Sequence, residues 1–235
     1  MSLTPVFDEE AAAGPEHLDP ALVAGYDRKA GVDAGDDIED LRAAGLGSDS
    51  TLVDLGAGTG AFALAAASRC RRVIAVDISP AMVDLMETRI SELGISNVEC
   101  VRAGFLTYEH AGAPADVIYT RNALHHLPDF WKAIALRRMA DVLRPGGILR
   151  LRDLVFAFGP DDAESAIGRW LDDASSARGQ DGWTRDELET HLRREHSTFT
   201  WLLEPMIERA GLRIDRAEHG AFGIYADYTC RRDHP

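Results

Sequence analysis

The sequence is poor in cysteine and lacks long apolar runs, and each shortage excludes a class of protein. Its three cysteines, Cys70, Cys100 and Cys230, lie far apart, with neither disulfide-framework nor zinc-site spacing. No apolar run approaches the ~20 residues that a membrane helix needs. Residues 1–15 have no basic start and no apolar centre, so they predict no secretory signal. We therefore expect reduced thiols and a cytoplasmic protein.

Basic residues are also scarce relative to acidic ones. There are 25 lysines and arginines against 39 aspartates and glutamates, which gives a formal net charge of −14. Such a charge repels nucleic-acid backbones and anionic lipid head groups unless a local basic patch opposes it. Four arginine pairs are scattered along the chain, with no aromatic ladder between them: Arg71-Arg72, Arg137-Arg138, Arg193-Arg194 and Arg231-Arg232. We therefore expect neither nucleic acid nor a membrane as a partner.

From residue 51 onward, short apolar runs alternate with amphipathic stretches. This pattern is typical of a parallel sheet with crossover helices. The expected strands are 52–55, 73–76, 98–101, 117–119 and 148–155. Helices are expected at 62–69, 81–93 and 130–142, and Pro145-Gly146-Gly147 is expected to stop the last of them. The chain of 235 residues therefore predicts an α/β fold in one domain.

A glycine-rich turn follows the first expected strand. It reads Gly56-Ala57-Gly58-Thr59-Gly60, and a helix opens directly after it. Glycines permit positive φ and let backbone amides approach a ligand at the helix N-terminus. Two cofactor classes use such a turn, dinucleotides and S-adenosylmethionine. The dinucleotide spacing G-x-G-x-x-G/A is satisfied by Gly56, Gly58 and Ala61, so the glycines leave both classes open.

Two acids favour one of these classes. Asp54 precedes the first glycine, where a carboxylate repels a pyrophosphate but attracts the amino group of an amino-acid ligand. Asp77 ends the next strand, where it can take both hydroxyls of a ribose, as either class requires. Alternatively, Asp54 caps the turn and Asp77 caps the helix that starts at Ala81. Because both acids are present, we favour S-adenosylmethionine.

Three segments, Val53 to Gly60, Ile74 to Met82 and Leu143 to Gly147, occur in this order. Together they resemble class I S-adenosylmethionine-dependent methyltransferases, of the small-molecule type related to ubiquinone and menaquinone biosynthesis. The resemblance covers about residues 46–153. It implies a Rossmann-like doubly wound sheet, mostly parallel with one antiparallel C-terminal strand, in the order 3-2-1-4-5-7-6 with helices on both faces. It also implies methyl transfer to a small molecule, with S-adenosyl-L-homocysteine as product.

The resemblance also implies a division of the single domain, 1–235, into four parts. Residues 1–45 are expected to form an N-terminal helical lid, and 46–158 the cofactor-binding core. Residues 159–200 are polar, with apolar residues at helical spacing, and are expected to be a variable insert that caps the substrate. Residues 201–235 are expected to complete the sheet with a helix at 201–210 and two strands at 212–218 and 222–229.

The same resemblance assigns residues to the cofactor. The glycine-rich turn is expected to contact the methionine and ribose parts, Asp77 the ribose hydroxyls, and Ile78 with Met82 the adenine. The family usually has an acid after the third strand that receives the adenine amino group, but here Phe105 stands at its place. The full expected set is Tyr26, Lys29, Asp54, Gly56, Ala57, Gly58, Thr59, Gly60, Asp77, Ile78, Met82, Gly104, Phe105, Leu106, Arg121, Asn122 and Ala123.

A pair of histidines follows the fourth expected strand, in a Leu124-His125-His126-Leu127 segment that is frequent in the same family. Methyl transfer requires an aligned nucleophile and, for a hydroxyl or an acidic carbon, removal of a proton. Either histidine could be this base, and we predict His126, because sequence neighbours cannot both point at the cofactor. Alternatively, both histidines pack or cap the following helix.

Charged and aromatic residues beyond the turn give the expected substrate contacts. Arg150 and Arg152 alternate on the fifth strand, whose interior position requires a carboxylate or ligand anion for each buried guanidinium. We expect an internal ion pair for Arg150. We expect Arg152 and Asp153 at the mouth of the site and Trp170 in the cap to bind substrate. No metal site is expected.

Two other functions stay open on the sequence. A nicotinamide-dependent oxidoreductase would use a similar turn, although the chain has no Tyr-x-x-x-Lys pair. A cofactor-binding module without turnover would keep the same turn and acids. The methyl acceptor and the oligomeric state are not encoded in any of these motifs.

Overall fold

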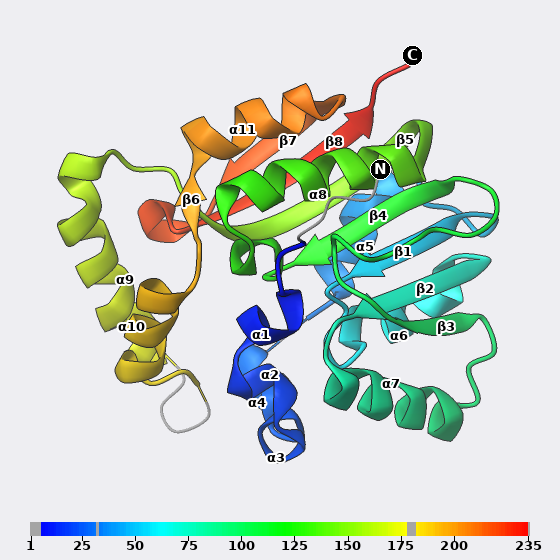
Figure 1. Ribbon diagram of the computed structural model, residues 1–235, viewed down its shortest axis with the longest axis horizontal. Coiled ribbons are helices and arrows are strands. Elements are labelled where there is room, and N and C mark those ends of the chain that lie inside the picture. Colours follow the sequence, from blue (N-terminus) through cyan, green and yellow to red (C-terminus); the bar gives the residue numbers. More distant parts are fainter. Residues whose placement is uncertain (1–5, 32, 178–181, 235) are drawn as a thin grey trace.

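In the computed structural model, which describes residues 6–31, 33–177 and 182–234, a mixed sheet forms the centre of the fold (Figure 1). Its order is β3-β2-β1-β4-β5-β8-β7, with β6 paired to β5 off this path. The parallel strands are β1 (Thr51–Leu55), β2 (Arg72–Asp77), β3 (Val98–Arg102), β4 (Ala115–Arg121) and β5 (Leu143–Phe156). The remaining strands are β6 (Thr198–Phe199), β7 (Leu212–His219) and β8 (Tyr225–Arg232).

This topology confirms the predicted sheet. β8 runs antiparallel to β5 and to β7, so it is the one strand of the seven-strand path that opposes the others. The predicted order 3-2-1-4-5-7-6 is the same order, because it numbers β7 and β8 as the sixth and seventh strands. The two-residue β6 was not predicted, and a run so short carries no detectable alternation in the sequence.

Helices cover both faces of the sheet. One face packs against α5 (Gly35–Ala44), α6 (Ala61–Ala66) and α7 (Pro80–Leu93), and the other against α8 (Asp129–Val142) and α11 (Thr200–Arg209). All five residues of β1 are buried, as expected for a strand with a helical layer on each side. Two apolar cores result, one on each face.

Three boundaries differ from the sequence prediction. α8 ends at Val142 and β5 begins at the next residue, so Pro145-Gly146-Gly147 lies within the strand and does not itself stop the helix. The last strand begins at Tyr225 because Phe222 and Gly223 adopt positive φ in a short 3-10 turn. α5, within the segment assigned to the lid, packs on the sheet through Ile38 and Leu41.

The segment predicted to be a lid holds four short helices before α5, and we use the name lid for them: α1 (Glu9–Ala13), α2 (Pro15–Leu18), α3 (Pro20–Val23) and α4 (Tyr26–Ala30). In Figure 1 they lie in blue between the sheet and two helices of the insert, α9 (Ala163–Ala177) and α10 (Arg185–Arg194). Lys29 forms an ion pair with Glu187 of α10. Glu16 lies 3.6 Å from the Nδ1 atom of His191. The lid therefore contacts both the core and the insert.

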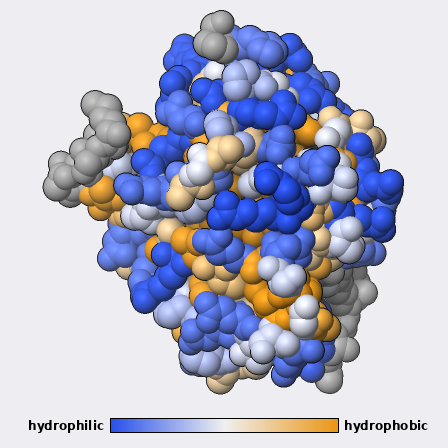
Figure 2. Space-filling view, turned by 90° about the vertical axis from the view of Figure 1, so that its right-hand side faces the viewer, coloured by the Kyte–Doolittle hydropathy of each residue, from blue (hydrophilic) through white to orange (hydrophobic). Residues whose placement is uncertain are grey.

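Among the described residues, no helix combines the length and the apolar character that a membrane crossing requires. The face shown in Figure 2 is covered mostly by hydrophilic residues, with hydrophobic ones gathered in smaller areas between them. The large hydrophobic side chains that the structure exposes are Val6, Leu22, Leu93, Phe130 and Trp201. Val6 precedes α1 and the other four come from four different helices, so the exposed large hydrophobic residues are spread along the chain.

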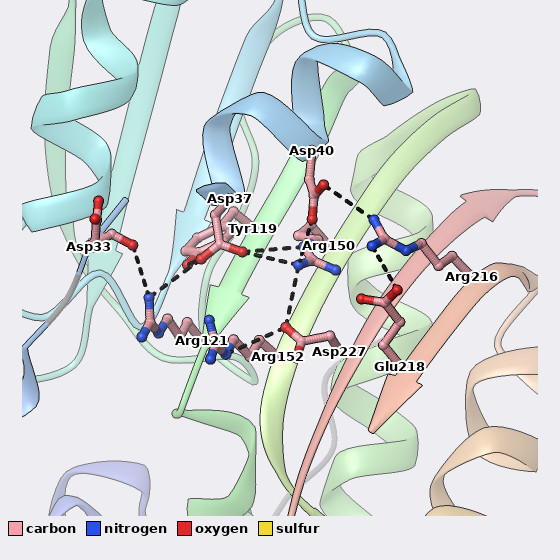
Figure 3. Close-up of polar contacts among 10 residues, drawn as sticks. All are labelled: Asp33, Asp37, Asp40, Tyr119, Arg121, Arg150, Arg152, Arg216, Glu218 and Asp227. Carbon is pink, nitrogen blue, oxygen red and sulfur yellow. Dashed lines mark hydrogen bonds and ion pairs between the residues drawn. The ribbon is translucent and has the colours of Figure 1, made fainter. Parts of the chain in front are cut away.

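A buried ion-pair cluster fixes α5 to the sheet (Figure 3). The Nη2 atom of Arg150 on β5 lies 3.2 Å from Oδ1 of Asp37, 3.1 Å from Oδ2 of Asp40 and 3.3 Å from Oδ1 of Asp227. The Tyr119 hydroxyl donates a hydrogen bond of 2.7 Å to the other oxygen of Asp37. The internal ion pair predicted for Arg150 is therefore present, and it has three partners.

Candidate active site

A cavity opens at the carboxyl ends of β1, β2 and β4, beneath the lid. Thirteen of the seventeen residues predicted to contact the cofactor line it: Tyr26, Asp54, Gly56, Ala57, Gly58, Thr59, Asp77, Ile78, Gly104, Phe105, Arg121, Asn122 and Ala123. Parallel strands end at the same edge of a sheet, which brings these sequence-distant residues together. We call this space the first cavity.

The other four predicted contacts lie outside the lining of the first cavity. Lys29 turns towards Glu187 and the ring of Trp183. Met82 is buried among lid and α7 residues. Gly60 caps α6 with its φ at 82°, and Leu106 is a buried residue of the core on the α8 face.

The glycine-rich turn is held against β2 by its own backbone. The amides of Gly56 and Ala57 donate to the carbonyl of Val76 at 2.9 and 3.0 Å. Gly56 has a φ of 74°, and a Cβ atom built on it would lie 2.5 Å from the Cβ of Ala123. Gly58 has a φ of 56° but open space around it. Both glycines are required by conformation, and Gly56 also by its close approach to Ala123, which follows β4.

This difference predicts unequal costs for two substitutions. Gly58→Ala is expected to destabilise the protein by about 1 kcal/mol, the cost of a left-handed residue. Gly56→Ala is expected to cost about 1–2 kcal/mol more, because the new methyl group collides with Ala123. Urea unfolding of the two variants measures the difference. Equal midpoints would show that the turn relaxes away from Ala123.

Two buried carboxylates face the first cavity. Burial, and then the charge of Asp77, hold the pKa of Asp54 well above its usual range. The Oδ2 atom of Asp54 is buried and has no hydrogen-bond partner among the described residues. Asp77 accepts hydrogen bonds from the amides of Gly58 at 2.7 Å and Ser79 at 2.8 Å. An unpartnered buried oxygen of this kind suits a ligand that brings a donor, such as an amino group.

The two histidines have different environments. His125 is buried, and its Nδ1 atom is bonded to Asp153 while its Nε2 atom lies 3.2 Å from Glu195. Burial by itself would lower the pKa of His125, but the two carboxylates outweigh it and raise the pKa to about 10. His126 lines the first cavity. Burial and then the charge of His125 hold the pKa of His126 well below its usual value.

A second cavity adjoins the first. The two share His17, Tyr26, Asn122 and His126. The rest of the second cavity is lined by residues of the insert, β5 and β8, together with His125: Leu154, Trp170, Trp183, Leu188, His191, Glu195 and Tyr225. Aromatic and aliphatic walls with a few polar groups are typical of small-molecule sites. His126 and Asn122 therefore stand where the two cavities meet.

The three residues predicted to bind substrate occupy different places. Trp170 lines the second cavity. Asp153 is buried behind His125 and orients its ring. Arg152 lies 3.4 Å from Asp227 and lines neither cavity.

Several residues at these cavities were not identified from the sequence, and three of them are Glu9, His17 and Glu195. Glu9 and His17 come from the lid, and Glu195 follows α10. Glu195 contacts His125 and also His191, and these contacts lower the pKa of its carboxyl. Local sequence carries no signal for such contacts, because Glu195 lies 70 positions from His125. A histidine and a glutamate in a polar helical stretch usually face solvent.

Two overlapping groups among the described residues have a geometry that could hold a metal ion. They are His125, His126 and Glu195, and Glu16, His191 and Glu195. In both groups, ion pairs between Glu195 and the histidines already account for much of the proximity.

Residues 52–147 match a family model described as a methyltransferase domain. The 27-O-demethylrifamycin SV methyltransferase of Amycolatopsis mediterranei is 31% identical over 126 residues, which cover 53% of this chain and 46% of that protein. The uncharacterized methyltransferase YcgJ of Bacillus subtilis is 30% identical over 122 residues, or 52% of this chain and 46% of that protein. The chain thus spans about half the length of these curated relatives.

Solved structures share the fold. The YcgJ protein of Bacillus subtilis superposes with a TM-score of 0.60 at 17% identity, over 86% of this chain and 98% of that one. The N-methyltransferase NodS of Bradyrhizobium japonicum, in complex with S-adenosyl-L-homocysteine, gives a TM-score of 0.58 at 18% identity, over 85% and 87% of the two chains. The matches confirm the Rossmann-like sheet.

Proposed function

We propose that this protein transfers a methyl group from S-adenosylmethionine to a small molecule, in keeping with the match of residues 52–147 to a methyltransferase-domain model. The observation that supports this most directly is the pair of carboxylates on the first cavity. Asp54 offers an unpartnered oxygen to the amino group of the methionine part. Asp77, next to the amide of Gly58, offers its carboxylate to the ribose hydroxyls.

The second cavity is the proposed acceptor site. Its walls, which include Trp170, Trp183 and Tyr225, suit an apolar or aromatic small molecule. Such an acceptor would meet the cofactor at His126 and Asn122, which line both cavities. The predicted absence of nucleic acid and membrane partners is part of the same proposal.

The proposed chemistry is an in-line displacement. An acceptor oxygen forms a bond to the methyl carbon, the bond from that carbon to sulfur breaks, and its electron pair stays on sulfur as S-adenosyl-L-homocysteine. His126 takes the hydroxyl proton, since its low pKa keeps the ring neutral at pH 7. His125 is a positioning residue, held by Asp153 on one side and Glu195 on the other. The carboxylate of Glu195 also favours the protonated form of His126.

Calorimetry with S-adenosyl-L-homocysteine tests the cofactor site. Asp77→Ala is expected to weaken binding by about 100-fold, because two hydrogen bonds to a charged group are lost. Asp84→Ala on α7 removes an exposed carboxylate and is expected to leave binding unchanged. Circular dichroism verifies that each variant is folded. If the wild-type protein does not bind S-adenosyl-L-homocysteine at all, the proposed function is wrong.

We also propose a cytoplasmic location and the four-part division of the chain. The cysteines are free thiols, two of them buried, which suits a reducing compartment. The positions of the two cavities support this division of the chain. Residues of the lid and core line the first cavity, and residues of the insert line much of the second.

A further inference from the structure

Glu9 of α1 reaches into the first cavity at the end that holds Ile78, Ala103 and Phe105. Glu9 is buried, with only 8% of its surface exposed. Its Oε2 atom accepts a hydrogen bond of 3.0 Å from the amide of Leu106. A lid residue therefore delivers a carboxylate to the loop that follows β3, almost a hundred positions along the chain.

Gly104 leaves the space that this carboxylate occupies. A Cβ atom built on Gly104 would lie 2.5 Å from both Oε1 and Oε2 of Glu9. The carboxyl group of Glu9 thus stands where a side chain of residue 104 would begin. Any larger residue at 104 would displace Glu9 from this position.

The carboxylate has no local reason to be buried there. Its neighbour Glu10 pairs with Arg102 at 2.8 Å in an exposed position, whereas Glu9 makes no ion pair with any described residue. Burial raises the pKa of Glu9, and the amides of Leu106 and Phe105 and the charge of Arg138 offset this only in part. Burying a carboxylate without a direct ion pair is costly, so a function at this point would explain it.

The surroundings of Glu9 specify the ligand group. Ala12, Ala13, Ile78, Ala103 and Phe105 give the cavity apolar walls at this end, which suit a flat ring. The Glu9 carboxylate is an acceptor, and only its Oε2 atom takes the Leu106 amide at 3.0 Å. Adenine has an exocyclic amino group that can donate to such a carboxylate. Asp77, the proposed ribose contact, lines the same cavity.

We propose that Glu9 accepts a hydrogen bond from the exocyclic amino group of the cofactor's adenine. This inference rests on the proposed function and adds a ligand-binding residue to it. The loop after β3 carries no carboxylate of its own in Gly104-Phe105-Leu106, and the lid supplies one. Adenine recognition therefore requires that α1 is docked on the core.

The test compares two nucleoside ligands by calorimetry. They are S-adenosyl-L-homocysteine and S-inosyl-L-homocysteine, in which an oxygen replaces the amino group. Glu9→Ala is expected to weaken binding of the adenosyl ligand by about 10-fold or more and to abolish the preference for it. Glu10→Ala is the matched control, since Glu10 is the adjacent acid and lies on the surface. It is expected to keep both the affinity and the preference.

A rescue variant separates recognition from folding. Gly104 has no positive φ, so an aspartate is allowed there once Glu9 is removed. The double variant Glu9→Ala, Gly104→Asp is expected to regain the preference for the adenosyl ligand. Wild-type affinity and preference in Glu9→Ala would overturn the inference and leave the proposed function intact, as would an equal loss for both ligands. Failure of the wild type to bind either ligand would overturn both.

Discussion

Replacing Arg150 with alanine is expected to lower the free energy of unfolding by about 3–5 kcal/mol. The guanidinium is 5% exposed and is shared by Asp37, Asp40 and Asp227. Its removal leaves Asp37, at 2% exposure, as a buried carboxylate whose remaining neighbours are the Tyr119 hydroxyl and Arg121. The cost arises mainly because Arg121, at 3.4 Å, is then the one cation left beside Asp37 among the described residues, whereas a fully paired buried ion is close to neutral for stability.

The Arg150→Ala substitution is also expected to disturb residues that line the first cavity. Tyr119 stacks on Phe62, with ring centroids 3.5 Å apart, and both rings line that cavity. Arg121, which lies 3.4 Å from Asp37, lines it as well. We therefore expect Arg150→Ala to weaken binding of S-adenosyl-L-homocysteine although Arg150 does not line the cavity.

Chemical denaturation with guanidinium chloride measures the effect, and Arg216→Ala is the matched control. Arg216 also pairs with Asp40, at 3.2 Å, and in addition with Glu218, but its side chain is 46% exposed (Figure 3). Exposed ion pairs contribute little to stability, so this control is expected to unfold at nearly the wild-type midpoint. Similar losses in both variants would contradict the assignment of the cost to burial.

Replacing His126 with alanine is expected to reduce the rate of methyl transfer by roughly 100- to 10,000-fold, the usual contribution of a positioned base. Binding of S-adenosyl-L-homocysteine is expected to change little, because the proposed cofactor contacts come from other residues. The assay follows labelled methyl groups from S-adenosylmethionine into a panel of small apolar and aromatic hydroxyl compounds. His219→Ala is the control, since His219 is exposed on β7.

The pH dependence of the same reaction follows from the direction of the pKa shift. A base must be neutral, so the rate is lost as the pH falls through the pKa of His126. That pKa lies well below its usual value of 6.5, so the rate is expected to stay level between pH 6.5 and 8. A steep fall already at pH 7 would exclude His126 as the base. Cofactor binding without transfer to any compound would favour a binding module without turnover.

The strands and the glycine-rich turn could be predicted from the sequence because their signals are local. Buried strands such as Leu52 to Leu55 are short apolar runs, and glycine at positions 56 and 58 is dictated by positive φ within the turn itself. Boundaries set by neighbouring strands were less accurate. β5 begins at Leu143, five residues before its predicted start, because pairing with β4 includes Ala115 and Leu143.

The roles of single charged residues were harder to assign. The sequence correctly predicted an internal ion pair for Arg150 but could not name Asp37, Asp40 and Asp227 as its partners. It also ranked His126 above His125 as the base, and it gave no sign that Asp153 and Glu195 hold His125 from both sides. The partners of Arg150 and of His125 both depend on which side chains come together from distant parts of the chain.

The sequence by itself determined the sheet, its helical layers and the turn with Asp54 and Asp77, since periodicity, glycine conformation and strand ends are properties of neighbouring residues. Only the tertiary structure decided which groups complete the cavities. Glu9 lies against Gly104 and Glu195 against His125 because the lid and the insert fold over one edge of the sheet. The free energy of such contacts depends on how deeply the groups are buried and on which charged groups lie beside them in space. Neither depends on how far apart the residues are in the sequence.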